Sequence, residues 1–513
     1  VVQDTVAPPL PFYTSTSLGI PVDSVTDATP LTNAAIETLS AAGGGHIIFR
    51  SVNGLVPYFK GTVINRSNVK LDFSYVPSVK LGPYGNLRNE GGYSESSAVI
   101  TLGASVAAGV STFIAVPASG SIDAYLSAGD KIILRGNRDS GGSPIWYQEM
   151  TVVTVDGPSG TVTTTEETDY AYTTTYPSSA YTAAGNDDFT TISRRVSTLL
   201  TADTTDSSKT FAVTSTTGFQ VGQIVELRDE KQCDDIAGAS TALINTEHFV
   251  ITDITSLNIT VDRRSRRVFD NAHAARLWLK DPCINASIIG ANIVFTEPPP
   301  ASPRIDPIIN WHAYRSPIER RKILNTESDA TIGSRGQMFC NRYSFRCGIY
   351  DCIGERPKYT AGGEGNALTN FHATECTASG IEATGCRHAS YMEASTSCYA
   401  HFASIKDGVS VAVYFHGCLE TDCHVVVDQA EAGRVSGSNT DFVAFGHSEN
   451  FAGTKDCTAS CGDGEYFDIA AVFEPGADGC EVSGSFANIR IGAQIFNRTA
   501  ANPVVVTRPS LRD

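Results

Sequence analysis

The sequence predicts an all-β protein organised around a parallel β-helix, in which short strands coil into a long solenoid. Strand-like segments recur at intervals of 21 to 31 residues between Gly336 and Phe496, and a period of this size is typical of one solenoid coil. Helical signals are strong only near the N-terminus, between residues 27 and 49. Two similar strand-rich segments between residues 97 and 270 interrupt the coil pattern and predict inserted β modules.

The first predicted element is a helix in the stretch DATPLTNAAIETLSAAGGGHIIF, residues 27–49. Thr29 is a good N-cap residue and Pro30 fits the first helical position. The apolar face is expected to contain Leu31, Ala34, Ala35 and Leu39. The glycines from Gly43 onward end the helix, and HIIF then reads as a buried strand. Because an amphipathic helix must bury its apolar face, we expect this helix to cover the open end of the β stack.

Two modules of similar order follow the first coils. The first contains STFIAV, AGDKIILRG, EMTVVTV and GTVTTT, and the second contains KTFAVT, VGQIVELRD, EHFVITDI and LNITVDRR. Each reads as a small antiparallel β unit with turn residues between its strands. The predicted organisation is therefore a cap helix with the first coils (1–96), two inserted modules (97–270), the main β-helix (271–496) and a C-terminal tail (497–513).

The thirteen cysteines support the solenoid, because eleven of them lie between Cys340 and Cys480. We expect one cysteine per coil to stack into an interior ladder of free thiols, since cysteine is small and readily buried. The predicted rungs are Cys347, Cys376, Cys398, Cys418, Cys457 and Cys480. Disulfides between stacked coils are the alternative. No cysteine pair has the spacing of a zinc site, so no metal or other cofactor is expected.

The net charge of −17 argues against nucleic acid and against anionic membranes as main partners. It does not exclude an anionic substrate, because a basic cleft can coexist with an acidic surface. No apolar run reaches transmembrane length, and the N-terminal residues lack the pattern of a signal peptide. Membrane insertion is therefore not expected.

The segment from Asp23 to Phe49, with its D-x-x-T-x3-AI-x3-A-x2-GGG-like texture, resembles the opening helix of the pectate-lyase-like right-handed β-helix superfamily. More narrowly, the chain resembles bacteriophage tailspike depolymerases, in which such a helix caps a right-handed parallel β-helix. In these proteins, GD-x-[IV]-x-[IL] strand modules are often inserted early. The common opening GDGxTDDT reads PVDSVTDAT here, a departure that concerns the subfamily rather than the fold.

The resemblance implies a homotrimer that recognises bacterial surface polysaccharide, either O-antigen or capsule, and usually cleaves it. It also implies a place in the virion, as part of the phage tail, after assembly in the bacterial cytoplasm. Attachment to the tail or baseplate would then use an N-terminal part that precedes Val1. The resemblance assigns no catalytic residue, because no shared catalytic motif can be carried over by position.

Candidate site residues come from the repeat itself, in which each clear segment sets one polar side chain beside apolar ones. The segments are SFRCG, NFHAT, YMEAS, YFHGC, FGHSE and VFEPG, and their polar residues are Arg346, His372, Glu393, His416, His447 and Glu474. Equivalent residues of adjacent coils lie ~4.8 Å apart, which predicts a polar ladder on one face. Glu449 lies two residues beyond His447 and is expected on the same side.

Carboxylates on neighbouring coils suit glycoside hydrolysis, which needs one acid to protonate the leaving oxygen and a second as base or nucleophile. We predict Glu393 as the base or nucleophile and Glu449 or Glu474 as the acid, with substrate bound by Arg346, His372, His416 and His447. Retaining and inverting geometry both remain open. A lyase acting on uronic acids and a receptor-binding spike without catalysis are the alternative functions. Polar residues at strand ends can also be ordinary solvated side chains.

Two further segments offer possible sugar contacts. The stretch IGERPKYTAGGEGNALTN, residues 353–370, lengthens one coil and supplies Glu355, Arg356 and Tyr359 for a groove wall. A subunit contact explains it equally well. The run WHAYRSPIERRK, residues 311–322, is the densest basic segment, with aromatic side chains for sugars and arginines for anionic groups. An ordinary surface charge cluster is the alternative explanation.

Overall fold

The structure is a computed structural model of the whole chain. It describes residues 11–94, 100–117, 119–136, 146–168, 191–232, 244–290, 292–296, 306–324, 337–355, 365–408, 411–416, 423–432, 441–445, 457–467, 469–473, 477, 479–487, 491–495, 505–506 and 510–512. No helix among these residues is long and apolar enough to span a membrane.

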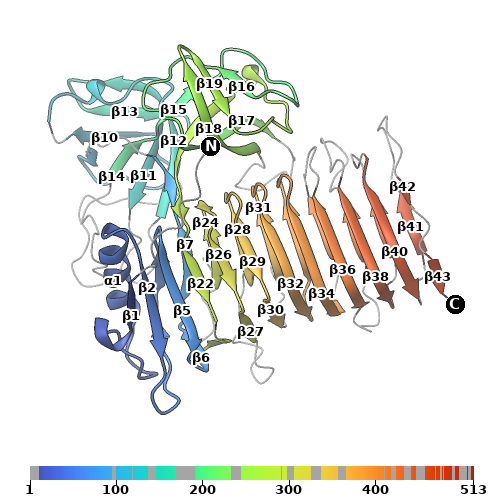
Figure 1. Cartoon of the computed structure of the whole chain (residues 1–513). Coiled ribbons are helices and arrows are strands. Elements are labelled where there is room, and N and C mark those ends of the chain that lie inside the picture. The colour runs from blue at the N-terminus through green and yellow to red at the C-terminus, as the bar shows by residue number, and fades with distance from the viewer. Residues whose placement is uncertain are drawn as a thin grey trace.

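The core of the molecule is the predicted parallel β-helix, formed by an 18-stranded and a ten-stranded sheet (Figure 1). The 18-stranded sheet contains β2 (Gly45–Arg50), β5 (Val69–Tyr75), β22 (Ser287–Ile289), β26 (Pro317–Glu319), β29 (Gly348–Tyr350), β32 (Thr377–Thr384), β34 (Tyr399–Gly408), β36 (His424–Ala432), β38 (Thr458–Glu465) and β40 (Glu481–Ala487). The same sheet also contains β1 (Phe12–Thr14), β3 (Tyr58–Phe59), β6 (Ser78–Leu81), β23 (Asn292–Phe295), β27 (Lys322–Leu324), β30 (Ile353–Glu355), β42 (Val505–Val506) and β43 (Ser510–Arg512). The last two strands pair with β40, so the predicted C-terminal tail contributes strands to the solenoid.

The ten-stranded sheet forms a second face of the coil, and all of its pairings are parallel. Its strands are β4 (Thr62–Asn65), β7 (Asn86–Glu90), β24 (Ile308–Trp311), β28 (Phe339–Arg342), β31 (Asn366–Phe371), β33 (His388–Glu393), β35 (Val411–His416), β37 (Asp441–Phe445), β39 (Ile469–Phe473) and β41 (Ile491–Ile495). Parallel pairing of the same strand in every coil fixes which residues stack, and therefore which side chains share a face.

Stacked columns of identical or similar side chains fill the interior. In the N-terminal coils, each buried asparagine donates from Nδ2 to Oδ1 of the next at 2.8–2.9 Å, along Asn65, Asn89, Asn310, Asn341 and Asn370. In the C-terminal coils the same column continues with rings, and Phe415, Phe445 and Phe473 stack at centroid distances of 5.1 Å. An amide ladder satisfies its own buried polar groups, whereas the ring stack needs no partners.

Helix α1 (Thr29–Ala41) covers the N-terminal end of the solenoid, as predicted (Figure 1). Ile36 and Leu39 are buried in the same core as Ile47 on the adjacent strand. The predicted apolar face was wrong in part, because Leu31 is 48% exposed. Thr32 lies on the buried side in its place.

The two inserts lie side by side above the N-terminal half of the solenoid (Figure 1). The first is a closed barrel of β9 (Ile100–Leu102), β10 (Thr112–Pro117), β11 (Lys131–Gly136), β12 (Trp146–Asp156), β13 (Thr161–Thr164) and β14 (Thr191–Arg194). The second insert contains β15 (Ser197–Leu199), β16 (Thr210–Ala212), β17 (Ile224–Gln232), β18 (Ile244–Thr255), β19 (Asn258–Val261) and β20 (Arg276–Asp281). Strand β8 (Gly92–Tyr93) pairs with β20. In each insert the last strand, β14 or β20, comes after the four segments that the two modules share in sequence. It completes the sheet although it lies further along the chain.

The eleven described cysteines are all buried free thiols, which contradicts the disulfide alternative for these residues. Backbone pairing places Cys347, Cys376, Cys398, Cys423, Cys457 and Cys480 on successive coils. The predicted ladder is therefore present with one correction, since Cys423 takes the rung assigned to Cys418. Cys418 itself lies outside the described residues.

Candidate functional site

The predicted polar residues do not form a single column. Strand pairing in the ten-stranded sheet aligns Arg342, Phe371, Glu393 and His416 on successive coils. Arg346 and His372 lie instead in the turns between the sheets, with left-handed φ angles of 53° and 47°. The prediction of one polar ladder was wrong because the polar residue lies at a different distance from the strand end in each segment. Three predicted residues, His447, Glu449 and Glu474, lie outside the described part of the chain.

Glu393 is half-buried at the end of β33 and points away from the core. Met392 before it is buried in the core, so the alternation of the strand turns Glu393 and Tyr391 to the outer side. Burial and the nearby Glu393 carboxylate raise the pKa of Tyr391 well above its usual value. Tyr391 therefore stays protonated, and its hydroxyl shares a hydrogen bond with Glu393.

A fixed cation lies close to this carboxylate. The Arg342 guanidinium is 5.0 Å from the Phe371 ring, 5.8 Å from the Trp311 ring and 4.0 Å from the Asp306 carboxylate. Burial alone would lower the pKa of Arg342, but the surrounding negative groups, including Asp306 and Glu393, raise it. Arg342 is therefore charged at any working pH, and a nearby cation favours the ionised form of a carboxyl group.

These residues form what we call the Glu393 strip: Trp311, Arg342, Phe371, Tyr391 and Glu393. Each of the five is half-buried. The strip combines aromatic rings, a permanent cation, a phenol and a carboxylate on neighbouring coils. Such a set can hold a ring by its face, bind polar groups on its edge, and supply a base or nucleophile.

His372 was predicted to bind substrate, but the structure buries it under the second insert with only 1% of its surface exposed. Its Nδ1 lies 2.9 Å from the Thr246 hydroxyl, and its ring stacks on Tyr343 at 5.0 Å. Burial lowers the pKa of His372 to about 3, so the imidazole is neutral. His372 is a packing residue of the joint between insert and coil.

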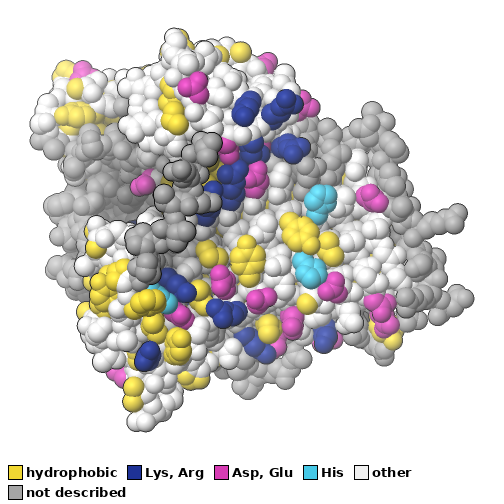
Figure 2. All heavy atoms as spheres, in the orientation of Figure 1, with side chains coloured by type: hydrophobic (Ala, Val, Ile, Leu, Met, Phe, Trp, Pro, Cys, Tyr) yellow, Lys and Arg dark blue, Asp and Glu magenta, His cyan; other side chains and the backbone are white. Residues whose placement is uncertain are grey.

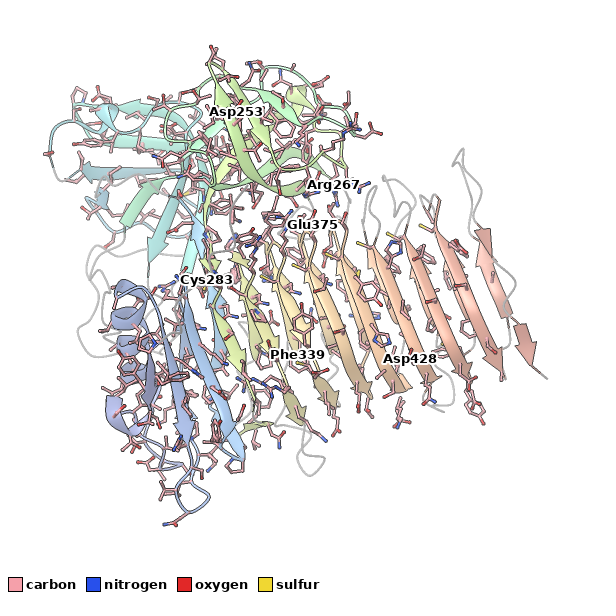
Figure 3. The ribbon with its side chains drawn as sticks, viewed as in Figure 1. Asp253, Arg267, Cys283, Phe339, Glu375 and Asp428 are labelled. Atoms are coloured by element: carbon pink, nitrogen blue, oxygen red, sulfur yellow. The ribbon has the colours of Figure 1, made fainter. Side chains whose placement is uncertain are left out.

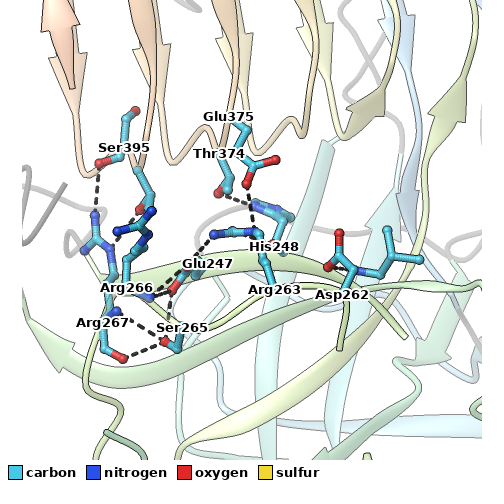
Figure 4. Close-up of polar contacts among 12 residues, drawn as sticks. Glu247, His248, Asp262, Arg263, Ser265, Arg266, Arg267, Thr374, Glu375 and Ser395 are labelled. Atoms are coloured by element: carbon cyan, nitrogen blue, oxygen red, sulfur yellow. Dashed lines mark hydrogen bonds and ion pairs between the residues drawn. The ribbon is translucent and has the colours of Figure 1, made fainter. Parts of the chain in front are cut away.

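Arg346 belongs to the same joint. Its guanidinium bonds Glu375 at 2.6 Å and Asp262 at 2.8 Å, and Glu375 also faces Arg263 at 3.0 Å. Figure 4 shows Glu375 of the coil turn facing Arg263 of the insert. Arg346 was predicted to bind substrate, yet in the structure it links carboxylates of the insert and of the solenoid.

Other polar contacts fasten the second insert to the coil turns. The buried Arg267 donates from Nε to the Thr396 hydroxyl at 2.9 Å and from a terminal nitrogen to the Ser395 carbonyl at 3.1 Å. His248 Nδ1 lies 3.0 Å from the Thr374 hydroxyl. Figure 3 shows Arg267 and Glu375 at this junction.

A buried charge cluster completes the joint. The Glu226 carboxylate accepts from the Tyr93 hydroxyl at 2.8 Å, from Lys280 at 2.9 Å, and faces His248 at 3.3 Å. Lys280 also contacts the buried His312. Burial would raise the pKa of Glu226, but Lys280 and His248 hold it well below its usual value. Burial lowers the pKa of Lys280 to about 8.

Sequence reasoning missed this cluster, although one signal was present. In IVEL and LWLK, Glu226 and Lys280 each follow apolar residues of a strand, and a charge buried in such a position needs a partner. The partners are 54 residues apart in the chain, so only the fold brings them together.

The remaining predicted residues are dispersed. Glu355 forms an ion pair with Lys322 at 2.8 Å on the 18-stranded sheet, and Arg356 and Tyr359 lie outside the described residues. The basic run 311–322 is divided: Arg321 is buried 4.9 Å from the Phe73 ring, and burial lowers its pKa to about 9. That run is therefore not one basic patch.

The outer face of the 18-stranded sheet carries aromatic and imidazole side chains that sequence reasoning missed. Tyr399 is 38% exposed, and two residues later His401 pairs with Asp428 at 3.1 Å. The Tyr350 ring lies back over Gly348, where an added Cβ would approach the ring within 2.2 Å. Glycine therefore lets this ring lie along the sheet, with its hydroxyl 3.0 Å from the Thr377 hydroxyl. Figure 2 shows hydrophobic and histidine side chains together on this face, and Figure 3 places Asp428 there.

The described residues contain no group of three or more His, Cys, Asp or Glu side chains arranged to hold a metal ion.

Comparisons with known proteins give structural likeness without sequence likeness. No protein-family model matches the chain, and no curated protein sequence matches it. The structure is similar to the gp54 tailspike of Acinetobacter baumannii bacteriophage AP22, solved in complex with A. baumannii capsular saccharide, at 9% identity and a TM-score of 0.45 over 97% of this chain and 75% of that one. It is also similar to the gp61 tailspike of Pseudomonas phage phi297, at 9% identity and a TM-score of 0.47 over 98% and 80%. A tailspike of E. coli bacteriophage HK620, in complex with a hexasaccharide, matches at 9% identity and a TM-score of 0.43 over 94% and 61%.

Proposed function

We propose that the chain is a phage tailspike that binds and cleaves bacterial surface polysaccharide, O-antigen or capsule, as an endo-acting glycoside hydrolase. The observation that carries the proposal is the Glu393 strip, where a half-buried carboxylate lies among aromatic rings, two coils from a permanent cation. The sequence resemblance to tailspike depolymerases points to the same class of substrate.

Glu393 serves as the base or nucleophile in this proposal. Its carboxylate form accepts a proton from water or attacks the anomeric carbon. Phe371 and Trp311 offer half-buried aromatic surface to sugars. The proton donor to the leaving oxygen is Glu449 or Glu474, as the sequence predicts.

A lyase is the second candidate, because Arg342 could hold a sugar carboxylate while His416, on the next coil from Glu393, removes a proton. The products separate the two. A hydrolase releases new reducing ends without an unsaturated sugar, whereas a lyase produces an unsaturated uronate that absorbs ultraviolet light.

The decisive variant is Glu393→Gln, which keeps the shape of the side chain and removes its charge. We expect turnover of the polysaccharide to fall by about 10²- to 10⁴-fold, the usual contribution of an acid or base, while binding persists. Glu382→Gln is the matched control, because Glu382 is exposed on the 18-stranded sheet. Full activity in Glu393→Gln would move the catalytic site away from the strip.

Assembly follows the same proposal. The chain forms a homotrimer in the virion, as part of the phage tail, and assembles in the bacterial cytoplasm. Side-by-side packing of three solenoids would bury flat sheet surface that one coil leaves open. Sedimentation should give three times the 54.5 kDa chain mass, and a stable monomer at micromolar concentration would contradict the trimer.

A further inference from the structure

The junction between the second insert and the coil turns concentrates positive charge, in a chain whose net charge is −17. Six arginines gather there: Arg263, Arg264, Arg266 and Arg267 on the insert, and Arg315 and Arg346 on the coil turns. The carboxylates of the same junction are Glu247, Asp262 and Glu375. Among the described residues, six arginines therefore meet three carboxylates here, and we call this surface the arginine junction.

The ion pairs between the insert and the coil turns involve Arg263 and Arg346. Arg263 bonds Glu247 at 2.7 Å and lies 3.0 Å from Glu375, and Arg346 bonds Glu375 and Asp262. Arg267 is buried against Ser395 and Thr396. The exposed arginines of the junction are Arg264, Arg266 and Arg315. Figure 2 shows Lys and Arg side chains extending from the insert down to the solenoid.

Backbone pairing fixes the coil arginines in a row. Arg315 and Arg346 occupy equivalent turns of adjacent coils, and their amides donate to the Phe345 and Thr374 carbonyls of the next coil. Both have φ angles near 50°, at 51° and 53°. Their Cα atoms are therefore about one strand spacing, ~4.8 Å, apart.

The arginine junction borders the aromatic face of the 18-stranded sheet. Arg346 lies two residues before Gly348, over which the Tyr350 ring is folded. Pairing then aligns Gly348, Thr377 and Tyr399 on successive coils. The arginines at this edge of the sheet therefore lie next to a surface of aromatic rings. That surface spans two strand spacings, or ~10 Å.

We propose that the arginine junction binds the acidic groups of an anionic bacterial polysaccharide, whose sugar rings lie on Tyr350 and Tyr399. Guanidinium groups match carboxylate and phosphate oxygens with planar pairs of donors, and clustered exposed cations on an acidic protein attract anions to one place. This inference rests on the proposed function, and it adds the chemical class of the ligand.

The test is binding of the full chain to purified bacterial capsular polysaccharides of known composition, both neutral and acidic, by biolayer interferometry. We expect an acidic polysaccharide to bind, with an affinity that decreases as salt increases. Reducing its carboxyl groups to alcohols, or removing its phosphate with hydrofluoric acid, distinguishes the two acidic groups. The modification that removes the recognised group should weaken binding about tenfold or more, the value of one charge-assisted hydrogen bond.

The variant Arg264→Gln/Arg266→Gln/Arg315→Gln should weaken binding of the same polysaccharide by at least about tenfold. A matched control, Arg50→Gln/Lys60→Gln/Lys406→Gln, changes the net charge equally at exposed sites elsewhere and should bind normally. A neutral ligand, or equal binding by the junction variant and the control, would overturn the inference and leave the proposed function intact. Binding to no polysaccharide in the panel would count against the proposed function itself.

Discussion

The joint beneath the second insert and the Glu393 strip contain the same kinds of side chain in opposite surroundings. At the joint, Glu226 is fully buried and meets Lys280, His248 and Tyr93 at hydrogen-bond distance. In the strip, Glu393 is half-buried, and Arg342, two coils away, lies among aromatic rings. Residue type alone therefore does not identify a reactive carboxylate. A carboxylate that is fully buried and bonded to its neighbours cannot contact substrate.

We expect the largest loss of unfolding free energy from a substitution of Lys280. Lys280→Met leaves the Glu226 carboxylate buried without its main partner, and breaking such a pair costs about 3–5 kcal/mol of unfolding free energy. Urea unfolding followed by fluorescence measures the loss. The double variant Glu226→Gln/Lys280→Met removes both charges and should recover most of the stability. A single variant as stable as the parent would show that the pair does not hold the joint together.

The second prediction is that His372 makes the unfolding free energy depend on pH. Its pKa is about 3 in the folded protein against 6.5 for an ordinary histidine, so between these values the unfolded chain binds a proton that the folded chain lacks. The unfolding free energy should therefore fall as pH decreases through this range, by about 1.4 kcal/mol per pH unit. Urea unfolding at pH 6.5, 5.5 and 4.5 should give a shallower slope for His372→Gln. Equal slopes in parent and variant would mean that His372 titrates normally.

At Arg321 we expect a smaller change, and a substitution there should raise the unfolding free energy instead of lowering it. Its three guanidinium nitrogens are buried without a hydrogen-bond partner among the described residues. Arg321→Met should raise the unfolding free energy by about 1–2 kcal/mol, because it replaces a buried charge by an apolar chain of similar length. Arg267→Met is the contrasting variant, since it would leave the Thr396 hydroxyl without its donor and should destabilise. Destabilisation by both substitutions would show that Arg321 has a stabilising partner.

The smallest effect on stability belongs to Glu393. Glu393→Gln should change the unfolding free energy by no more than about 0.5 kcal/mol, as is usual away from buried networks. A loss similar to that of Lys280→Met would place Glu393 among the structural carboxylates.

The sequence was sufficient for the architecture because the coil repeats its own pattern. The recurrence of strand segments and cysteines predicted the parallel β-helix, and the Pro30 and Gly43 signals predicted the cap helix. The site was harder, because the phase of a side chain depends on turn length. Arg346 and Glu393 look alike in SFRCG and YMEAS, yet one lies in a left-handed turn and the other on a strand.

The joint could not be predicted from local sequence at all. Arg267 meets Ser395 and Thr396 more than 120 residues away, and its own segment, RRSRRVF, indicates only a basic surface loop. Such contacts depend on how the insert docks on the coil, which no local pattern encodes.

The most direct test of the proposed active site is a crystal structure of Glu393→Gln with an oligosaccharide produced from the bound polysaccharide. We predict a sugar ring over the Phe371 or Trp311 ring, with the amide introduced by the Glu393→Gln substitution within hydrogen-bond distance of the cleaved linkage. An oligosaccharide bound only elsewhere, with the Glu393 strip unoccupied, would contradict the assignment of the strip as the catalytic site.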